Sequence, residues 1–322
     1  MIHVLENIGL KEESILSLSE QAGVKTYLGP IDSKIKSDIK GIYSGLSYNL
    51  DHTFLSQYPN LRFIASPTTA LTHIDKDYCE QNSIQVLSLK NKRDLIANFT
   101  STVEIAWWHI LELNRQCSSA QKSVLDGNWN RNQFFTTSLN NKKIGIIGFG
   151  RLGKKMGEIA NSFNMKVYAY DIAFEGTNSV HFDYQEAQSI NEIFEKCDFV
   201  SIHVDDRKEN ANLISKQQFD FIKNEGLIII NTSRGFVINE SDAIEALKIG
   251  KLKGLGIDVL IDEDRNDKSI NWVAENLIVK TKKESNLNIS ITPHIGGATV
   301  DSLTVAAEAI FNELLQCVST TS

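Results

Sequence analysis

Residues 144–156 read IGIIGFGRLGKKM, and the interpretation of the whole chain starts from them. The apolar run 144–148 predicts a buried strand, the spacing of Gly148, Gly150 and Gly153 predicts a tight turn, and residues 154–163 predict a helix. In parallel α/β sheets this order of elements binds the pyrophosphate of a dinucleotide, because the helix N-terminus presents free N–H groups and a partial positive charge. The alternative is a glycine-rich turn that binds no ligand.

Asp171 indicates which dinucleotide this turn would bind. It ends the next predicted strand, 166–171, where its carboxylate can accept hydrogen bonds from the ribose hydroxyls of the adenosine. The same carboxylate would repel a 2′-phosphate, and the following Ile172-Ala173-Phe174 contains no Arg or Lys to bind one. The predicted cofactor is therefore NAD and not NADP.

Short apolar runs elsewhere in the chain predict two parallel sheets. After residue 143 the runs are nearly continuous, as in a sheet covered on both faces. Before residue 97 they are shorter and alternate with helical stretches opened by Asp51 and Asp75. The predicted strands are residues 24–28, 41–44, 62–66, 85–89, 144–148, 166–171, 199–204, 227–231, 255–259 and 289–294. The predicted class is α/β, with two Rossmann-like or flavodoxin-like parallel-sheet domains and a cleft between them.

Two long helices are predicted at the junctions of these patterns. Residues 100–115 contain no Gly or Pro and lie between the two sheets in sequence, and residues 299–318 form an amphipathic helix. Trp107 and Trp108 face different directions because they are adjacent on a helix. Either one packs inward and the other faces a partner, or both belong to the core.

Helix starts after residue 143 carry capping patterns. Ser189 with Glu192 and Ser215 with Gln218 fit the capping box, and Asn239 is placed to cap a helix that runs through residue 247.

Composition limits the classes of function. The 322 residues suggest about two domains, and the net charge of −7 disfavours a protein that binds nucleic-acid phosphates. No apolar run is long enough to span a bilayer, and the N-terminus shows no secretory pattern. We therefore expect a cytoplasmic protein with no nucleic-acid or membrane partner. The four scattered cysteines predict buried free thiols and no metal site; they are Cys79, Cys117, Cys197 and Cys317.

Polar residues lie where the strands after residue 143 end. They are Asp171, His203, Ser233 with Arg234, Asp258 and His294. The carboxyl ends of parallel strands line the ligand crevice of such a sheet, so we expect these residues to form one site.

These residues and motifs resemble the D-isomer-specific 2-hydroxyacid dehydrogenase family, which includes the phosphoglycerate dehydrogenases. The resemblance covers nearly the whole chain and is weaker before residue 95. It rests on residues 144–156, 197–204 (CDFVSIHV), 230–235 (INTSRG), 251–259 (KLKGLGIDV) and 291–297 (ITPHIGG). It implies a discontinuous substrate domain, residues 1–97 plus 298–322, an NAD-binding Rossmann domain, residues 98–297, and a homodimer.

The resemblance implies that Arg234, Glu263 and His294 are the catalytic residues of an NAD-dependent oxidoreductase that interconverts a small 2-keto acid and its D-2-hydroxy acid. The chemistry of these side chains agrees with that role. A guanidinium binds a carboxylate through two parallel hydrogen bonds, and an imidazole is a proton donor near neutral pH. Glu263 would raise the pKa of His294. Taken alone, His294 could also be a core histidine.

The remaining site residues follow from the glycine-rich motif and from the resemblance. The predicted cofactor-binding residues are Gly148, Gly150, Arg151, Leu152, Gly153, Asp171, His203, Val204, Thr232, Ser233, Asp258 and Gly296. For His203 a purely structural role is an equal alternative. The predicted substrate-binding residues are Ser44, Thr68, Thr69, Ala70 and Leu71, together with Arg234.

Three departures from the family pattern bear on the substrate and cofactor. Asp205 replaces a usual proline beside the adenine side of the cofactor site, the segment around Tyr43 lacks an arginine for a substrate phosphate, and Pro67 and Ala70 stiffen the substrate loop. An insertion at 89–96 carries Lys90, Lys92 and Arg93, which either bind an anionic substrate tail or form a solvated loop.

Two alternative functions remain open. One is an NAD(H)-sensing binding protein, such as a corepressor on the same fold. The other is a dehydrogenase of a phosphorylated hydroxy acid such as 3-phosphoglycerate.

Overall fold

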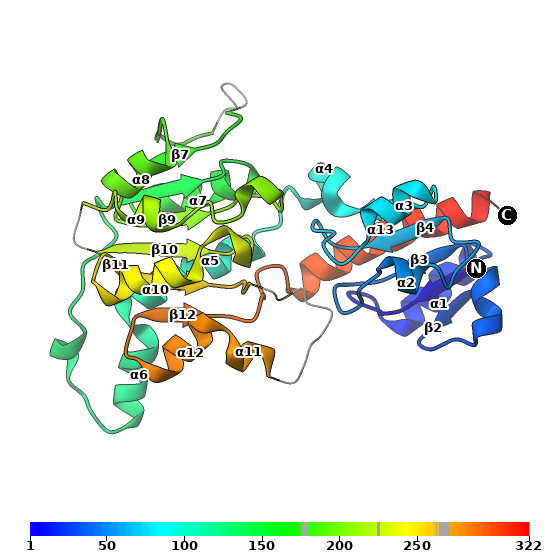
Figure 1. Cartoon of the computed structure of the whole chain (residues 1–322), viewed down its shortest axis with the longest axis horizontal. Coiled ribbons are helices and arrows are strands. Elements are labelled where there is room, and N and C mark those ends of the chain that lie inside the picture. The colour runs from blue at the N-terminus through cyan, green and yellow to red at the C-terminus, as the bar shows by residue number, and fades with distance from the viewer. Residues whose placement is uncertain (175–179, 224–225, 262, 264–270, 322) are drawn as a thin grey trace. The chain divides into compact units, whose positions relative to one another are not determined.

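The computed structural model describes residues 1–174, 180–223, 226–261, 263 and 271–321 (Figure 1). The chain forms two compact units: unit 1 comprises Met1–Phe99 and Ala298–Ser322, and unit 2 comprises Thr100–Gly297. Unit 2 is thus inserted between the two segments of unit 1. None of the helices within the described ranges is long and apolar enough to cross a membrane.

Unit 1 is built on a five-stranded parallel sheet. Its strand order is β2 (Thr26–Leu28), β1 (Ile2–Val4), β3 (Gly41–Tyr43), β4 (Phe63–Ser66) and β5 (Gln85–Ser88). The short helices are α2 (His52–Leu55), α3 (Lys76–Gln81) and α4 (Arg93–Ile96). Asp51 and Asp75 cap α2 and α3 by accepting hydrogen bonds from backbone N–H groups. Strand β1 was not predicted, because its three residues, Ile-His-Val, make too short a pattern to read.

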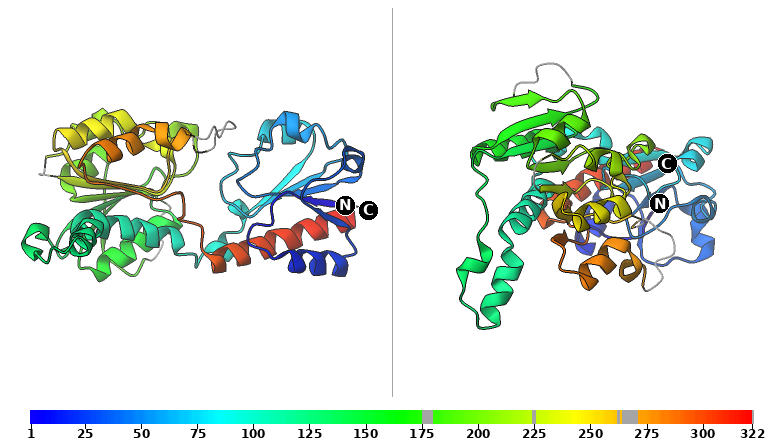
Figure 2. Two further views of the ribbon diagram at one scale, coloured as in Figure 1. Left: turned by 90° about the horizontal axis from the view of Figure 1, so that it is seen from below. Right: turned by 60° about the vertical axis from the view of Figure 1, so that its left-hand side comes forward.

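The last helix of the chain completes the core of unit 1. Helix α13 (Val300–Thr320) contacts β3, β4 and β5, and α13 lies with α1 (Glu12–Gln21) on one face of the sheet (Figure 2, left). Phe311 is fully buried and meets the ring of Tyr43 edge to face, with the ring centres 5.3 Å apart. A Cβ atom on Gly41 would lie 3.0 Å from Leu314, so a glycine allows the helix this close to β3.

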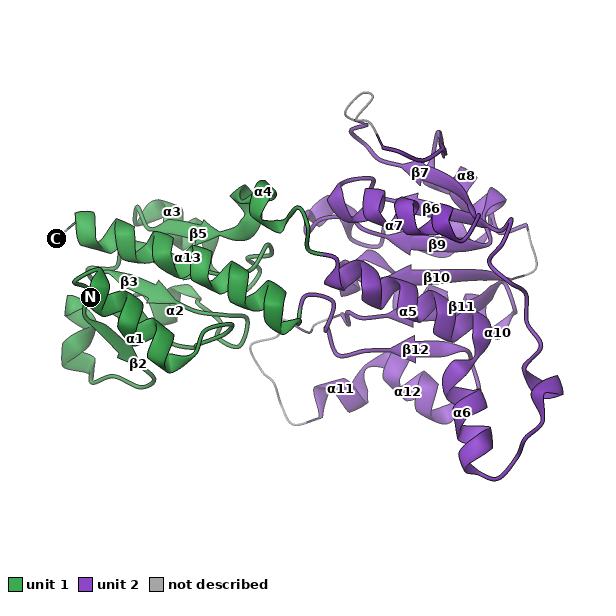
Figure 3. Cartoon of the chain, turned by 180° about the vertical axis from the view of Figure 1, so that it is seen from behind, with its two compact units in different colours: residues 1–99, 298–322 green, residues 100–297 purple. Residues whose placement is uncertain are grey.

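Unit 2, purple in Figure 3, contains a seven-stranded parallel sheet. The strand order is β12 (Ile289–Ile291), β11 (Leu252–Ile257), β10 (Leu227–Asn231), β9 (Phe199–Ile202), β6 (Lys143–Ile147), β7 (Lys166–Tyr170) and β8 (Tyr184–Glu186). The order reverses at β6, which pairs with β7 on one side and β9 on the other. The predicted parallel α/β fold is confirmed, with β8 as an edge strand that was not predicted.

Helices cover both faces of the unit 2 sheet. On one face are α5 (Ser101–Arg115) and α7 (Arg151–Ser162); on the other are α8 (Ile190–Lys196), α9 (Lys216–Phe219), α10 (Glu240–Lys248) and α12 (Leu277–Glu284). The further helices are α6 (Cys117–Leu125) and α11 (Trp272–Glu275). Successive residues of β10 face opposite cores: Ile228 and Ile230 pack with α5, and Ile229 packs with the other layer. This double burial explains why its sequence is apolar throughout.

Two predicted helix caps form as expected and one differs. Asn239 Oδ1 accepts a hydrogen bond from Asp242 N at 3.1 Å, and Gln218 Oε1 accepts one from Ser215 N at 3.1 Å. Ser189 Oγ accepts one from Glu192 N, but the Glu192 carboxylate binds the N–H of Gln188 and not that of Ser189.

The structure decides between the alternatives for the two tryptophans. Trp107 is buried against Phe163, whereas the side chain of Trp108 is 43% exposed, so they are not both core residues.

The structure corrects the predicted burial of two of the four cysteines. Cys79 and Cys197 are buried free thiols as predicted. Cys117 is exposed, since α6 contributes no buried residue, and Cys317 is only half-buried on α13.

Candidate functional site

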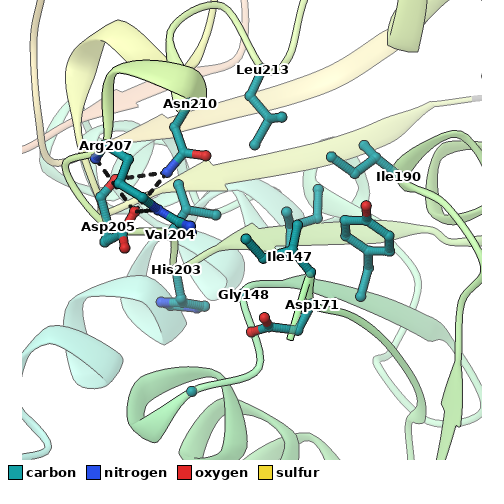
Figure 4. A pocket seen from close by; sticks show the side chains of 13 residues that line it. Ile147, Gly148, Asp171, Ile190, His203, Val204, Asp205, Arg207, Asn210 and Leu213 are labelled. Carbon is teal, nitrogen blue, oxygen red and sulfur yellow. Dashed lines mark hydrogen bonds and ion pairs between the residues drawn. The ribbon is translucent and has the colours of Figure 1, made fainter. Parts of the chain in front are cut away.

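A pocket of about 280 Å³ lies in unit 2 where the strand order reverses (Figure 4). It is lined by residues at the carboxyl ends of β6, β7 and β9, among them Gly148, Gly150, Asp171, His203 and Val204. The structure therefore brings together these five residues of the predicted cofactor-binding set.

Each of the three positions of the motif requires a glycine for a different physical reason. Gly148 has φ +89°, and a Cβ atom there would lie 2.4 Å from the carbonyl oxygen of His203. A Cβ on Gly153 would lie 2.1 Å from the carbonyl oxygen of Gly148. Gly150 has an ordinary φ of −78°, and apart from its chain neighbours no described atom comes within 4 Å of its Cβ position. The fold itself thus needs Gly148 and Gly153, whereas Gly150 leaves open space in which a pyrophosphate fits at the start of α7.

Asp171 is fixed at the rim of this space. Its Oδ2 accepts a hydrogen bond from Phe149 N at 2.7 Å, and its Oδ1 accepts one from Ala173 N at 2.9 Å. Both oxygens retain a lone pair for a ribose hydroxyl. Residues Arg151 and Leu152 lie in the first turn of α7, next to the same space.

The segment after β9 holds a cation that the sequence prediction overlooked. Arg207 lines the pocket together with Asp205 and Asn210. Asp205 Oδ1 accepts hydrogen bonds from Arg207 Nε at 2.8 Å and from Asn210 Nδ2 at 2.9 Å (Figure 4). This ion pair raises the pKa of Arg207. The hydrogen bonds of Asp205 with Arg207 and Asn210 also stabilise this turn, at the position where the family usually has a proline. The departure at Asp205 was the available clue, because a carboxylate two residues before an arginine can pair with it.

His203 is a neutral histidine in this structure. Its Nε2 lies 2.8 Å from Ser201 Oγ, and burial lowers its pKa to about 4. Its Nδ1 atom is buried and has no hydrogen-bond partner among the described residues. With its pKa lowered in this way the ring is not an imidazolium at neutral pH, so burial favours a lining role over acid catalysis.

A second group of predicted residues lies at the ends of β10, β11 and β12. His294 Nδ1 is 3.0 Å from Glu263 Oε1, with the histidine side chain 38% exposed and the glutamate 16%. The hydrogen bond to Glu263 raises the pKa of His294, which burial opposes; the charge of Asp258 adds to the rise and that of Arg234 reduces it. Since Nδ1 is used by Glu263, Nε2 is the atom left to give a proton.

Arg234 is placed by a buried asparagine that the sequence prediction did not single out. Asn231 is fully buried at the end of β10; its Oδ1 accepts from Ser233 N at 3.0 Å and Ser233 Oγ at 2.7 Å, and its Nδ2 donates to Arg234 O at 2.8 Å. The Arg234 guanidinium itself donates to Ser233 O. Thr232, which lies between Asn231 and Ser233 in the sequence, is buried. Its Oγ1 has no hydrogen-bond partner within the described part of the chain.

Asp258 uses its carboxylate inside the protein. It is 1% exposed, and it binds the backbone and side chains of residues 292–296: Thr292 Oγ1 and Ile295 N donate to Oδ1 at 2.5 and 2.9 Å, and Gly296 N donates to Oδ2 at 2.8 Å. His294 N donates to the Asp258 carbonyl at 2.8 Å. The sequence prediction assigned Asp258 and Gly296 to the cofactor; here they bind each other.

Apart from Arg234, the predicted substrate residues belong to unit 1. Ser44 is buried and donates to Gly45 O at 3.1 Å, and Thr68 Oγ1 donates to Ala70 O at 2.7 Å. Thr69 is exposed in this loop, and Leu71 is buried. The predicted site residues thus fall into two sets, these in unit 1 and the cofactor and catalytic candidates in unit 2. Within the described ranges, no cluster of His, Cys, Asp or Glu is placed to hold a metal ion.

Known proteins similar to this chain are dehydrogenases and reductases of hydroxy and keto acids. Hydroxypyruvate reductase of Thermotoga maritima is 30% identical over 259 residues, which cover 79% of this chain and 78% of that protein. Human D-3-phosphoglycerate dehydrogenase is 26% identical over 273 residues, 85% of this chain and 48% of that protein. The chain therefore spans about half the length of the phosphoglycerate dehydrogenases that it matches over most of its own length.

The fold is also that of a solved dehydrogenase. D-lactate dehydrogenase of Aquifex aeolicus, solved with NAD and lactic acid, matches with a TM-score of 0.75 and 23% identity over 99% of this chain and 94% of that one. The model of the D-isomer specific 2-hydroxyacid dehydrogenase NAD-binding domain matches residues 107–296, which include both groups of site residues in unit 2. The chain thus belongs to the D-isomer specific 2-hydroxyacid dehydrogenase family, and its residues 107–296 are that family's NAD-binding domain.

Proposed function

We propose that this protein is an NAD-dependent dehydrogenase that interconverts a small 2-keto acid and its D-2-hydroxy acid. The observation that carries the proposal is the His294–Glu263 pair, 3.0 Å apart, next to Arg234 in the NAD-binding unit. A histidine with a raised pKa is a proton donor at neutral pH, and a nearby arginine suits a carboxylate substrate. The D configuration follows from the family. On this proposal unit 1 supplies the substrate domain, including Ser44 and the loop 68–71.

Each residue of the group has one task. Arg234 binds the substrate carboxylate with its planar guanidinium, and Asn231 holds the turn that carries Arg234. His294 gives the proton on Nε2 to the carbonyl oxygen during reduction and takes it back during oxidation. Glu263 keeps Nε2 available by binding Nδ1 and stabilises the imidazolium. The bound nicotinamide ring supplies or accepts the hydride.

One ion pair bears on whether the substrate carries a phosphate group. Lys92, one of the cations proposed to bind a phosphorylated tail, pairs with Glu313 of α13 at 2.9 Å. The charge of Lys92 is thus compensated, whereas Lys90 and Arg93 are exposed side chains of the same segment. We propose an unphosphorylated 2-keto acid as the substrate. The relative from Thermotoga maritima, a hydroxypyruvate reductase, is named for an unphosphorylated 2-keto acid and supports the same choice. We also propose that the protein acts in the cytoplasm, in keeping with the free thiols of Cys79 and Cys197.

The activity can be tested with a panel of keto acids. Purified protein with NADH should oxidise the cofactor in the presence of pyruvate, hydroxypyruvate or a longer 2-keto acid, followed by absorbance, and 3-phosphohydroxypyruvate should be a poorer substrate. His294→Ala should lower kcat about 10²- to 10⁴-fold, the usual contribution of a positioned acid. Tight NADH binding without turnover on any keto acid would refute the dehydrogenase and favour a dinucleotide-sensing binding protein. Full activity of His294→Ala would refute the proton donor.

The pH dependence of reduction should move when Glu263 is neutralised. Reduction needs protonated His294, so activity is present below the raised pKa and is lost as the pH rises through it. Glu263→Gln removes the main cause of the rise and should shift this alkaline limb of kcat to lower pH, with oxidation at low pH improving in parallel. Asp301→Asn, at an exposed carboxylate of α13 in unit 1, is the control. An unmoved limb in Glu263→Gln would contradict the assignment.

Gly150 should matter for the cofactor and not for the fold. Because its Cβ position is open, Gly150→Ala should raise the Kd for NADH at least about tenfold, or about 1.4 kcal/mol, while changing the free energy of unfolding little. Gly153→Ala, whose Cβ would lie 2.1 Å from Gly148 O, should instead lower the free energy of unfolding by about 1–3 kcal/mol. Calorimetric NADH titration and denaturant unfolding measure the two effects. Equal NADH affinity of Gly150→Ala and wild type would argue against a pyrophosphate there.

We further propose a homodimer, formed through α6 and the chain that follows it. This arm extends away from the sheet of unit 2 (Figure 2, right) and carries exposed apolar side chains, with Trp129 89%, Leu125 79% and Phe135 73% exposed. No helix residue of α6 is buried within unit 2. A solvated arm with this composition would expose an unusually large apolar surface, and such surfaces mark protein interfaces.

The dimer is tested by sedimentation. Wild type should sediment as a dimer, and Leu125→Asp with Trp129→Asp should sediment as a folded monomer, because buried charges are costly at an apolar interface. Ile249→Asp, an exposed apolar residue after α10, is the matched control and should stay dimeric. A monomeric wild type, or a double variant that remains dimeric, would refute the interface.

A further inference from the structure

A histidine of α5 lies buried against β11 and β12, beneath the candidate site. His109 is in the middle of α5 and is fully buried, with the apolar Ala106, Ile110 and Leu113 among its buried neighbours on this helix. Two turns before it, Thr102 Oγ1 of the same helix donates to Gly296 O at 3.1 Å. A Cβ atom on Gly256 of β11 would lie 2.8 Å from His109 Cβ, so this glycine admits the histidine against the strand. A polar side chain in such a position needs partners for both ring nitrogens, because an unpaired buried polar atom is destabilising.

Both ring nitrogens have partners on the strand that leads to His294. Nδ1 lies 2.9 Å from Ser290 Oγ, and Nε2 lies 3.0 Å from Thr292 Oγ1. Ser290 belongs to β12, and Thr292 begins the loop that carries His294 two residues later. The histidine therefore reaches from α5 to the loop of the proposed proton donor.

The direction of these hydrogen bonds follows from the chemistry of the partners. Thr292 Oγ1 lies 2.5 Å from Asp258 Oδ1, and a carboxylate can only accept, so the single hydroxyl proton of Thr292 points to Asp258. Thr292 Oγ1 must then accept from His109, which requires a proton on Nε2. Nδ1 is left as an acceptor for the hydroxyl proton of Ser290. Burial lowers the pKa of His109 to about 4, which agrees with a neutral ring.

This chain of hydrogen bonds ends at the Asp258 carboxylate, which binds residues 292–296. The same Asp258 carboxylate that accepts from Thr292 also accepts from Ile295 N and Gly296 N. His294, between these contacts, has φ +52°, a left-handed conformation that side chains other than glycine and asparagine disfavour. The loop needs support to hold His294 in this conformation with Nδ1 toward Glu263.

We propose that His109 is a positioning residue for His294, which acts by donating from Nε2 to Thr292 and so fixing the hydroxyl that binds Asp258 and the loop 292–296. The inference rests on the proposed function only in the role of His294 as the proton donor. His109 itself touches neither substrate nor cofactor; its effect passes through two side chains. The family motif around His294 did not require it, and a leucine would fill the same face of α5.

Three substitutions separate the hydrogen bond to Thr292 from simple space filling. Gln places an N–H donor near the position of Nε2, Asn places its polar group near Nδ1 and cannot reach Thr292, and Leu makes neither bond. His109→Leu and His109→Asn should lower kcat for keto-acid reduction about tenfold or more, the scale expected when a proton donor is misplaced by a fraction of an ångström. His109→Gln should stay within about threefold of wild type, and the KM for NADH should change little in all three. His52→Leu, at an exposed histidine of unit 1, is the control.

A double-mutant cycle tests the route through Thr292. Thr292→Val keeps the volume and removes the hydroxyl, so it should lower kcat to a similar extent. If His109 acts through Thr292, His109→Leu combined with Thr292→Val should be no worse than Thr292→Val alone. Multiplicative losses would overturn the proposed route. Wild-type activity in His109→Leu, or equal activities in the Asn and Gln variants, would overturn the positioning role.

A measurement without turnover keeps this inference separate from the proposed function. The imidazole resonance of His294, assigned by its loss in His294→Ala, can be titrated by NMR in each variant. The charged groups that face His294 are Glu263, Asp258 and Arg234. A loosened loop should weaken the bond to Glu263 and lower the pKa of His294 in His109→Leu and His109→Asn, but not in His109→Gln. An unchanged titration refutes the positioning role whether or not any keto acid is reduced, whereas a shift without turnover refutes only the dehydrogenase.

Discussion

The buried carboxylate of Asp258 is the constraint on which the candidate active site depends. A charge that is 1% exposed is strongly destabilising unless donors surround it, and here one hydroxyl and two backbone N–H groups of residues 292–296 do so. Because the Asp258 carboxylate requires these hydrogen-bond donors, residues 292–296 fold around it. His294 takes its unusual backbone conformation as a consequence, and Glu263 then binds its Nδ1. The proposed proton donor is thus placed by a neighbouring charge and its hydrogen bonds, more than by its own contacts.

The two groups of site residues in unit 2 are positioned in the same way: a side chain at the end of a strand forms hydrogen bonds that fix a nearby turn. Asn231 does so after β10 and Asp258 after β11, while Asp171 binds the glycine-rich turn from the end of β7. Parallel strands place all their carboxyl ends at one edge, so these three turns meet there. The net charge of −7 makes local anion binding necessary, and Arg234 and the start of α7 supply it without a basic surface.

Much of the fold could be predicted from periodicity and local motifs. The strands of unit 2 were recognisable because burial on both faces makes them apolar throughout, and the start of α10 because Asn239 forms a local cap. Strand β1 was missed because three residues carry no period, and β8 because only one of its faces packs against the unit. Arg207 was missed because its place in the pocket depends on the fold of a loop that departs from the family pattern at Asp205.

By itself the sequence determined the fold class and the NAD-binding motif, and it named Arg234, Glu263 and His294 as catalytic candidates, because each of these follows from local spacing or from a family motif. Only the tertiary structure decided that Gly150 is a glycine for the sake of open space, that the Asp258 carboxylate binds the His294 loop, and that His109 reaches this loop from a distant helix. The physical reason is that hydrogen bonds and steric contacts between side chains join residues far apart in sequence, and no local pattern records which donor meets which acceptor.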